Sequence, residues 1–138
     1  MKLTRAQSYA LRAVIHIAGA HKKNRNNQII PSHQIAKERK IPPRFLLKVL
    51  KPLVDHQLLL SIKGPSGGYS LAKPANEMTV LEVIEAADGP ISGSAPEGKE
   101  GDRNSPLSMR LDELCSQVAE QTRKQLNKIK ISELVIRD

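Results

Sequence analysis

The stretch Lys63-Gly64-Pro65-Ser66-Gly67-Gly68-Tyr69 lies between two short segments that have β-strand character. The segment before it, residues 58–62, is almost wholly apolar, and the segment after it, residues 69–71, alternates apolar and polar side chains. Three glycines and a proline between such segments predict a β-hairpin whose turn uses positive φ angles. An ordinary surface turn is the alternative, so the interpretation depends on what surrounds the hairpin.

Charge is distributed unevenly along the 138 residues. Residues 1–63 contain 13 Lys and Arg against two acidic residues, a net charge of +11, whereas residues 64–138 carry a net charge of −3, which together give the +8 of the whole chain. Lys and Arg side chains displace the counterions that condense on nucleic acids, so the first half is typical of a nucleic-acid-binding segment. A solvated basic surface is the bland alternative.

Composition narrows the class of protein further. The length suffices for one ordinary core, no apolar run approaches the roughly 20 residues that span a membrane, and no apolar signal segment opens the chain, so we expect a soluble, cytoplasmic protein. The single cysteine, Cys115, cannot form a disulfide within the chain. One phenylalanine, two tyrosines and no tryptophan leave few rings on which unpaired bases could stack, which favours double-stranded DNA as the partner.

A helix is predicted from the capping-box pattern Thr4-Arg5-Ala6-Gln7 to about Ala20. Its expected inward-facing residues, spaced by three and four, are Leu11, Val14, Ile15 and Ala18. Residues 21–27 are expected to form a polar loop. Residues 28–31 are too few for a helix, and we expect an extended segment that pairs with the hairpin as a third strand.

A helix-turn-helix is predicted between residues 32 and 55. Ser32 is expected to cap a helix over residues 33–39, in which Ile35 and Ala36 face inward. The sequence Ile41-Pro42-Pro43 ends this helix and begins the next one, because proline disfavours a helical residue before it and is well placed in a first turn. Together with the hairpin, this motif predicts a winged helix-turn-helix that is mainly α with a small β wing.

The second helix of the motif, residues 43–55, is expected to recognise DNA. Its predicted core residues are Phe45, Leu46, Val49, Leu50, Leu53 and Val54. Arg44, Lys48 and Lys51 then share one exposed face at spacings of four and three, which suits a major groove. Pro52 removes the backbone donor for the Lys48 carbonyl, so a kink or an early end is expected there.

Two further helices are predicted downstream. A second capping-box pattern, Thr79 to Glu82, begins a helix that ends at Gly89-Pro90, with Val80, Leu81, Val83, Ile84 and Ala87 as its apolar residues. Ser105-Pro106 begins the last helix. Its apolar stripe, predicted as a dimer interface, consists of Leu107, Leu111, Leu114 and Val118, continued by Leu126 and Ile129. Packing of this stripe on its own domain is the alternative.

These elements divide the chain into three parts. Residues 1–90 are expected to form the DNA-binding domain, and residues 106–138 the dimerisation helix with a C-terminal segment. Residues 91–105 are rich in Gly, Ser and charged side chains and cannot bury enough apolar surface to order themselves, so a mobile loop is expected.

Several short segments resemble one family. They are Leu3-Thr4-Arg5-Ala6, residues 9–13, Ile35-Ala36, Phe45-Leu46, residues 50–53 and, most specifically, residues 63–72. The pattern is similar to the IscR/BadM/Rrf-type bacterial transcription regulators over residues 1–90, and residues 126–129 and 132–134 are similar to the C-terminal signature of that family. The resemblance implies a homodimer that binds palindromic operators and usually represses.

The best-known members of that family hold an iron-sulfur cluster with three cysteines in the loop equivalent to residues 91–105. Here this loop contains no cysteine, and its Ser92, Ser94, Asn104 and Ser105 are poor ligands for iron. Cys115 falls within the predicted dimerisation helix, where a cysteine packs as a small apolar residue. We therefore expect no cofactor.

No other chemistry is indicated by the sequence. The four histidines, His16, His21, His33 and His56, are dispersed without a Cys or carboxylate at ligand spacing, so we expect surface or turn residues and no metal site. Motifs for nucleophilic catalysis or phosphate binding are absent from the sequence, which argues against an enzyme.

The sequence thus predicts a dimeric regulator, a repressor that blocks a promoter by binding double-stranded DNA. Its expected DNA-binding residues are Thr4, Arg5, Ser32, Arg44, Phe45, Lys48, Lys51, Lys63, Ser66 and Gly67. Leu47 stands where cluster-bearing members of the family often carry a carboxylate that tunes site choice, so the operator is not specified by the resemblance. An effector, a small molecule or a protein, is expected near residues 91–105. The alternative function is a winged-helix module that binds a metabolic enzyme or another regulator, with only weak affinity for DNA.

Overall fold

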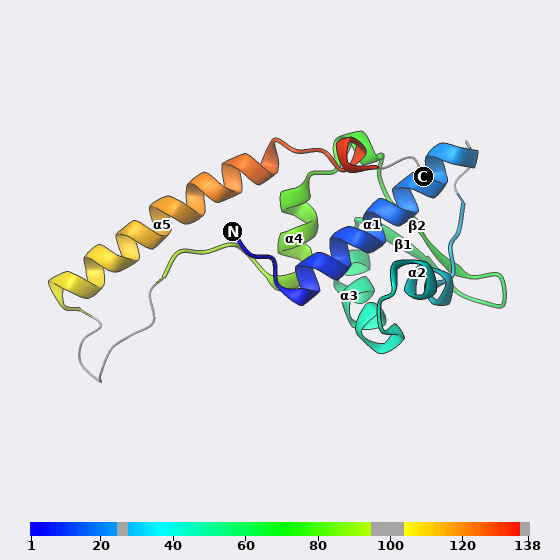
Figure 1. The fold of residues 1–138 in the computed structure, drawn as a ribbon, viewed down its shortest axis with the longest axis horizontal. Coiled ribbons are helices and arrows are strands. Elements are labelled where there is room, and N and C mark those ends of the chain that lie inside the picture. Colours follow the sequence, from blue (N-terminus) through cyan, green and yellow to red (C-terminus); the bar gives the residue numbers. More distant parts are fainter. Residues whose placement is uncertain (25–27, 95–103, 136–138) are drawn as a thin grey trace.

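The computed structural model describes residues 1–24, 28–94 and 104–135. Its elements follow in the order α1 (Arg5–Asn24), α2 (Ser32–Arg39), α3 (Pro43–Asp55), β1 (Leu59–Ile62), β2 (Gly68–Leu71), the 3-10 helix η1 (Ala75–Glu77), α4 (Val80–Asp88), α5 (Pro106–Asn127) and the 3-10 helix η2 (Ile131–Leu134). Figure 1 shows α1 to α4 gathered around the two strands, with α5 leading away from them as an arm. The predicted class, mainly α with a small β wing, is confirmed.

The hairpin forms as predicted and is tied to the chain before α2. Strands β1 and β2 pair antiparallel, and Ile30 joins them through a bridge in which Ile30 and Tyr69 exchange two backbone hydrogen bonds of 2.9 Å. Gly64 has a φ of 108°, which suits a glycine in the turn. A side chain at Gly68 would collide with the Ile30 carbonyl group, so this glycine permits the close approach that anchors the wing.

Helix α1 begins as predicted but ends later. The Thr4 hydroxyl accepts from the Gln7 backbone N–H at 3.1 Å, and the Gln7 side chain accepts from the Thr4 N–H at 2.9 Å, which forms the capping box. The helix continues to Asn24, so the predicted loop is wrong over residues 21–24, and its remainder, residues 25–27, lies outside the described residues. Residues 21–24 include neither glycine nor proline, and nothing in their backbone stops the helix.

The buried face of α1 differs in part from the predicted stripe. Val14 and Ala18 are buried as expected, whereas Leu11 and Ile15 are only partly buried. The positions that complete the buried face are Ala10, Ala13 and Ile17. The spacing in the sequence selected the larger apolar side chains as the buried face. Alanines are buried there instead, because their small side chains allow α1 to lie close to its neighbours.

The helix-turn-helix forms with two local corrections. Ser32 is the first residue of α2, not its cap, because Pro31 is the extended residue before the helix and its carbonyl accepts from the Gln34 N–H at 3.1 Å. Helix α3 continues through Pro52 and ends at Asp55 as predicted, so of the two expectations at Pro52 the early end is wrong and the kink stays a prediction. The fully buried Leu53, immediately after Pro52, gives the last turn a reason to remain helical despite the lost hydrogen bond.

The core between α3 and α4 is close to the prediction. The buried residues of α3 are Leu46, Val49, Leu50 and Leu53, while Val54 is partly buried and Phe45 is exposed, so Phe45 is not a core residue. The capping box at Thr79 and Glu82 forms, and α4 ends at Gly89 as predicted. Ala86 rather than Ala87 completes the buried face of α4.

The segment after α5 returns to this core, a feature that the sequence did not reveal. Ile131 of η2 has no exposed surface, and its N–H donates to the Met78 carbonyl at 2.8 Å. The Val80 N–H donates to the Ile129 carbonyl at 2.9 Å, and Thr79 and Lys130 form an isolated bridge. The far end of the arm is therefore fastened to the beginning of α4.

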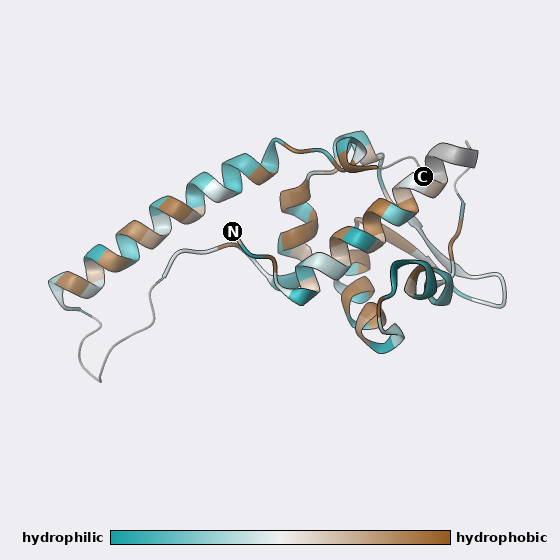
Figure 2. Ribbon diagram, in the orientation of Figure 1, coloured by the Kyte–Doolittle hydropathy of each residue, from teal (hydrophilic) through white to brown (hydrophobic). Residues whose placement is uncertain are grey.

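Helix α5 exposes the predicted apolar stripe. The Ser105 hydroxyl caps it by accepting from the Ser108 N–H at 3.1 Å, and Pro106 is its first residue, as predicted. Leu107, Leu111, Leu114 and Val118 are between 41% and 65% exposed, so the alternative that they pack on their own domain is wrong. Figure 2 shows hydrophobic residues recurring along the whole arm. Leu126 does not continue the stripe, because it packs partly buried against the core.

One further expectation, a mobile loop, concerns the chain between α4 and α5. Most of the predicted mobile loop, residues 95–103, lies outside the described residues. The described part, residues 91–94, has no regular structure, and the Gly93 carbonyl accepts from the Ser116 hydroxyl of α5 at 3.0 Å.

In the described ranges no helix combines the length and apolar character needed to cross a membrane.

Candidate nucleic-acid interface

One face of α3 is basic and forms no ion pair with the described part of the chain. Burial of Leu46, Leu50 and Leu53 turns Arg44, Lys48 and Lys51 outward, and all three are exposed. Within the described residues none of these three cations forms an ion pair. They can therefore bind an external polyanion without breaking an ion pair with a described residue.

Two large apolar side chains border this basic face. Phe45 is 45% exposed, and the Lys48 Nζ lies 5.8 Å from the centroid of its ring, within the range of a cation–π interaction. Leu47 is 50% exposed and lies three residues after Arg44 and four before Lys51. The predicted DNA-binding residue Phe45 is thus exposed on the same helix as the cations.

The basic helix is held by the turn before it and by a polar link to α1. Lys40 takes the left-handed conformation that ends α2, and Ile41, which is buried, donates its N–H to the Ala36 carbonyl at 2.9 Å. His16 of α1 is also buried, and its Nδ1 accepts from the Arg39 Nε at 2.8 Å.

The other ring nitrogen of His16, Nε2, lies 3.1 Å from Glu38 Oε2. Because Arg39 Nε is a donor, Nδ1 must be the acceptor and the proton lies on Nε2, facing Glu38. His16 therefore fastens α2 to α1, and the expectation that it is a surface residue is wrong. The sequence carried no signal for this, because its two partners are more than 20 residues away.

A groove of about 370 Å³ separates the start of α2 from the wing. Its lining includes three predicted DNA-binding residues, Ser32, Lys63 and Gly67, while the fourth in this region, Ser66, is exposed at the hairpin tip. Ser32 and His33 of the first turn of α2 line this groove, and that turn has no acidic residue and no side-chain cap, so no carboxylate competes there for an anion. The surroundings of the groove suit a phosphate.

The remaining predicted residues, Thr4 and Arg5, are exposed at the start of α1. Thr4 uses its oxygen as an acceptor in the capping box, which leaves its hydroxyl hydrogen for an outside partner. In Figure 1 the start of α1, the start of α3 and the tip of the hairpin lie along the lower edge of the winged domain. The predicted residues thus belong to α1, α2, α3 and the hairpin, and the groove between α2 and the wing lies among them.

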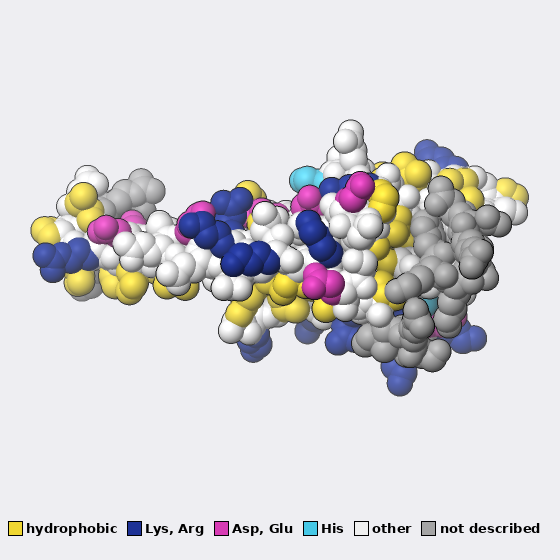
Figure 3. All heavy atoms as spheres, turned by 90° about the horizontal axis from the view of Figure 1, so that it is seen from above, with side chains coloured by type: hydrophobic (Ala, Val, Ile, Leu, Met, Phe, Trp, Pro, Cys, Tyr) yellow, Lys and Arg dark blue, Asp and Glu magenta, His cyan; other side chains and the backbone are white. Residues whose placement is uncertain are grey.

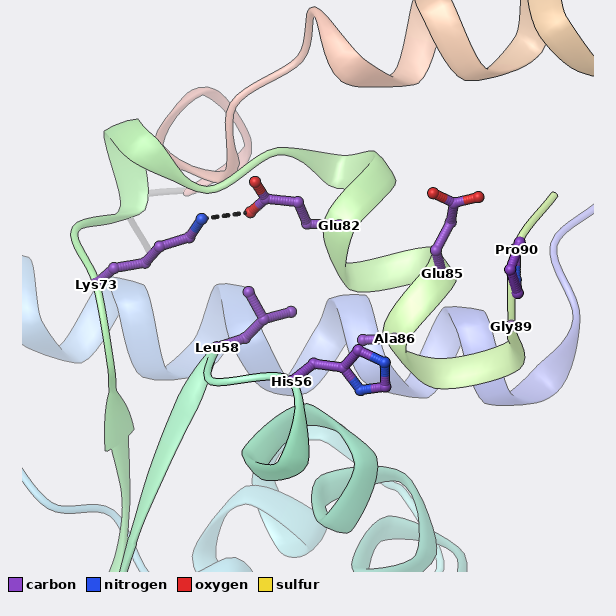
Figure 4. Close-up of a pocket in the computed structure, with 8 residues that line it drawn as sticks. All are labelled: His56, Leu58, Lys73, Glu82, Glu85, Ala86, Gly89 and Pro90. Carbon is purple, nitrogen blue, oxygen red and sulfur yellow. Dashed lines mark ion pairs between the residues drawn. The ribbon is translucent and has the colours of Figure 1, made fainter.

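A second cavity, of about 510 Å³, lies where the end of α3 meets α4 (Figure 4). At one end Lys73 Nζ forms an ion pair of 2.7 Å with Glu82 Oε2. On the side toward α5, Glu85 Oε2 accepts from the Ile91 N–H at 2.8 Å and lies 3.3 Å from the Arg123 Nε of α5. The wall of this cavity therefore includes Glu85, which connects α4 to the arm. The sequence did not indicate this role of Glu85.

A family model of regulators, Rrf2, described as an iron-dependent transcriptional regulator, matches residues 3–137 of this chain. The chain belongs to the Rrf2 family. This confirms the resemblance that the wing and helix segments indicated.

Curated relatives are similar over two thirds of this chain or more. The HTH-type transcriptional regulator IscR of Cereibacter sphaeroides is 30% identical over 116 residues, which cover 80% of this chain and 74% of the relative. The HTH-type transcriptional regulator Rv1287 of Mycobacterium tuberculosis is 32% identical over 92 residues, 67% of this chain and 55% of the relative. The chain thus spans little more than half the length of the first curated relatives that it matches.

Solved structures of the Rrf2 family share the fold of the whole chain. CymR, the global cysteine regulator of B. subtilis, superposes with a TM-score of 0.73 at 22% identity and covers 98% of this chain and 96% of its own. IscR of T. potens gives a TM-score of 0.71 at 17% identity, covering 98% of this chain and 86% of its own. The arm and the winged domain together are therefore a fold that these proteins share.

The family description mentions iron, so we compared the side chains of this chain with those that an iron-sulfur cluster requires. Its one thiol, Cys115, is half-buried on α5, and the backbone of Gly93 lies directly against the Cys115 backbone. Over the described ranges, no three His, Cys, Asp or Glu side chains converge in a way that could hold a metal ion. The donor set of this chain does not fit a cluster bound by three cysteine thiolates.

Proposed function

We propose that this Rrf2 chain is a sequence-specific regulator that binds double-stranded DNA as a homodimer and represses transcription by blocking a promoter. The observation that carries the proposal is the basic face of α3, Arg44, Lys48 and Lys51, which forms no ion pair with the described residues and stands beside the wing. Lys73, by contrast, is paired with Glu82 inside the protein. The cations of α3 remain available to an external ligand.

The residues divide the work of binding. Arg44 and Lys48 lie on the early turns of α3, the part of a recognition helix that reaches base edges, and Lys51 with Phe45 borders them. Lys63, Ser66 and Gly67 bring the wing to the neighbouring minor groove. Thr4, Arg5 and Ser32 hold phosphates at the starts of α1 and α2, which fixes the register without reading sequence.

The exposed stripe of α5 supports the dimer. A helix with four half-exposed apolar residues at spacings of four, three and four buries them when it pairs with its own copy. In this proposal residues 1–90 bind DNA, residues 91–105 link, and residues 106–138 dimerise. Because η2 fastens the end of the arm to α4, the dimer sets the separation of the two α3 helices and thereby favours a palindromic site.

We also propose that regulation does not use an iron-sulfur cluster. A small molecule or a protein is then the effector that changes the separation of the recognition helices. The proposed binding site of this effector is the cavity in Figure 4, because Glu85 in its wall contacts both the chain leaving α4 and Arg123 of the arm. A ligand there would act on the joint between the two parts.

The salt dependence of binding to a random DNA duplex tests the proposal. If a dimer contacts roughly six or more phosphates, its affinity falls about a thousandfold between 50 and 200 mM salt. The double variant Arg44→Glu with Lys48→Glu should abolish binding. Its matched control, Lys124→Glu with Lys128→Glu near the end of α5, makes the same change of charge and should bind more nearly as the unmodified chain does.

The alternative function, a winged-helix module that binds a metabolic enzyme or another regulator, gives a different result. Its affinity for the duplex would be weak and nearly independent of salt, and the two double variants would behave alike. Thermal unfolding of each variant shows whether a lost affinity reflects a lost fold.

A further inference from the structure

We infer that Leu47 determines operator specificity by contacting the C5-methyl group of a thymine in the major groove. The inference rests on the proposed DNA-binding function and adds the chemistry that one base pair must present.

Leu47 is placed for contact with a partner and not for the core. Its neighbours along the helix, Leu46 and Leu50, fill the buried side of α3 and have no exposed surface. Leu47 is half-exposed on the edge of the basic face, with Arg44 and Lys51 as its neighbours at spacings of three and four.

The two cations beside Leu47 narrow what can cover it. A single exposed leucine is common on protein surfaces and needs no explanation by itself. This one, however, lies between two cations that form no ion pair with the described residues, on the helix that we propose faces DNA. A surface that presents negative charge around an apolar group therefore fits it best. The major groove has this character, since phosphates line it and the thymine methyl is the apolar group on its floor.

Phe45 is the competing apolar residue on α3, and the geometry makes it the weaker candidate. The ring of Phe45 lies under the Lys48 ammonium group at 5.8 Å, so a base that approached this face would have to displace the lysine. Leu47 has no such interaction. Its side chain also lacks any hydrogen-bonding group, so it distinguishes bases only by apolar contact.

The test uses duplexes that the full chain selects from a random library, in which thymines are then replaced one at a time by deoxyuridine. Deoxyuridine pairs as thymine does but lacks the methyl group. At one thymine of the half-site the replacement should weaken binding about fourfold, the loss expected for one buried methyl group.

Two variants of the same position sharpen the test. Leu47→Ala should bind the thymine and deoxyuridine duplexes equally, whereas Leu47→Met, which keeps an apolar side chain of similar size, should restore most of the difference. Leu134→Ala is the matched control, because Leu134 is an exposed leucine of η2, away from α3, and this variant should keep the fourfold difference.

The outcomes separate the inference from the function beneath it. If every deoxyuridine duplex binds as tightly as its thymine parent, or if Leu47→Ala keeps the difference, Leu47 does not read a methyl group, although DNA binding stands. If Phe45→Ala removes the difference instead, the contact belongs to Phe45 and the inference is wrong. If no duplex of any sequence binds, the proposed function fails and this inference fails with it.

Discussion

Basic side chains in this molecule fall into two groups that have different physical roles. Lys73 and Arg123 are paired with Glu82 and Glu85, and these pairs join the end of the sheet and the arm to α4. The cations of α3 have no such partner within the described residues. Exposed ion pairs stabilise a fold little, so this division matters chiefly for which charges remain available to a ligand.

At this scale Arg44 and Lys63 should respond differently to substitution. Arg44→Ala removes a group that can bond two acceptors on a guanine, so preference among sequences should change by about 1 to 3 kcal/mol. Lys63→Glu removes a phosphate contact and adds a repulsion, so it should weaken binding to all sequences and reduce the salt slope by about one. Fluorescence anisotropy on two duplexes of different sequence measures both effects.

Lys73 provides the control for the Arg44 and Lys63 substitutions. Lys73→Ala changes a cation that is paired with Glu82 and lies outside the proposed interface, and its effect on sequence preference should be small. Losses for Arg44→Ala that are equal on both duplexes would remove Arg44 from base reading and leave it as a phosphate contact.

At the scale of elements, Gly68 and Gly19 differ in whether the surrounding structure leaves room for a side chain. A Cβ at Gly68 would strike the Ile30 carbonyl and lie 2.8 Å from the Pro31 nitrogen, so Gly68→Ala should pull the third strand from the wing and cost about 1 to 3 kcal/mol in the free energy of unfolding. A Cβ at Gly19 in α1 would meet only Val135 Cγ1, at an ordinary 3.6 Å. Gly19→Ala should therefore stabilise the protein by roughly 0.5 to 1 kcal/mol.

Denaturant unfolding followed by circular dichroism measures the two changes on one scale. Opposite signs for the two glycines are the expected result. Equal stability of Gly68→Ala and the unmodified chain would mean that the bridge between Ile30 and Tyr69 contributes nothing to the fold.

The beginnings of helices were predictable because their signals are local. Thr4, Thr79 and Ser105 each accept from a backbone N–H three residues on, and no distant residue is needed for that bond. The ends of α3 and α4 were also predicted, whereas the end of α1 was not. At Pro52 the local rule indicates a break, but burial of Leu53 outweighs one lost hydrogen bond.

The candidate site was predictable where a face of one helix composes it, as with the cations of α3. It was not predictable where distant segments meet. His16 joins residues of α2, and the cavity in Figure 4 joins residues near 56, 73 and 85, and no spacing in the sequence signals either meeting. Ile131 was missed for the same reason, since its partner Met78 is more than 50 residues away.

At the scale of the whole molecule, the arm is the feature that most needs a partner. Figure 3 shows it standing out from the body of the protein, with hydrophobic side chains along one edge of the view. A lone helix with a narrow apolar stripe is marginal in water, and pairing with its copy is the arrangement that buries the same stripe on both chains.

Leu111→Asp tests this pairing. The variant would bury a charge in each copy of the interface, so the dimer should dissociate to monomers at micromolar concentration, as measured by sedimentation velocity. Gln117→Asp adds the same charge at an exposed position of α5 outside the stripe and should leave the dimer intact. A dimer that survives Leu111→Asp would place the interface elsewhere.

The last prediction concerns iron, where this chain departs from the description of its family. A cluster needs several thiolates, and this chain offers only Cys115, on α5 with Gly93 against its backbone. In a dimer, each copy would supply one thiol, at a position set by the helix rather than by the loop after α4. We therefore expect a colourless protein that binds its selected duplex equally well before and after anaerobic reconstitution with iron and sulfide, and we expect Cys115→Ser to behave in the same way. Visible absorbance with stoichiometric iron and sulfide would contradict this, and its loss in Cys115→Ser would identify the thiol as a ligand that other donors complete.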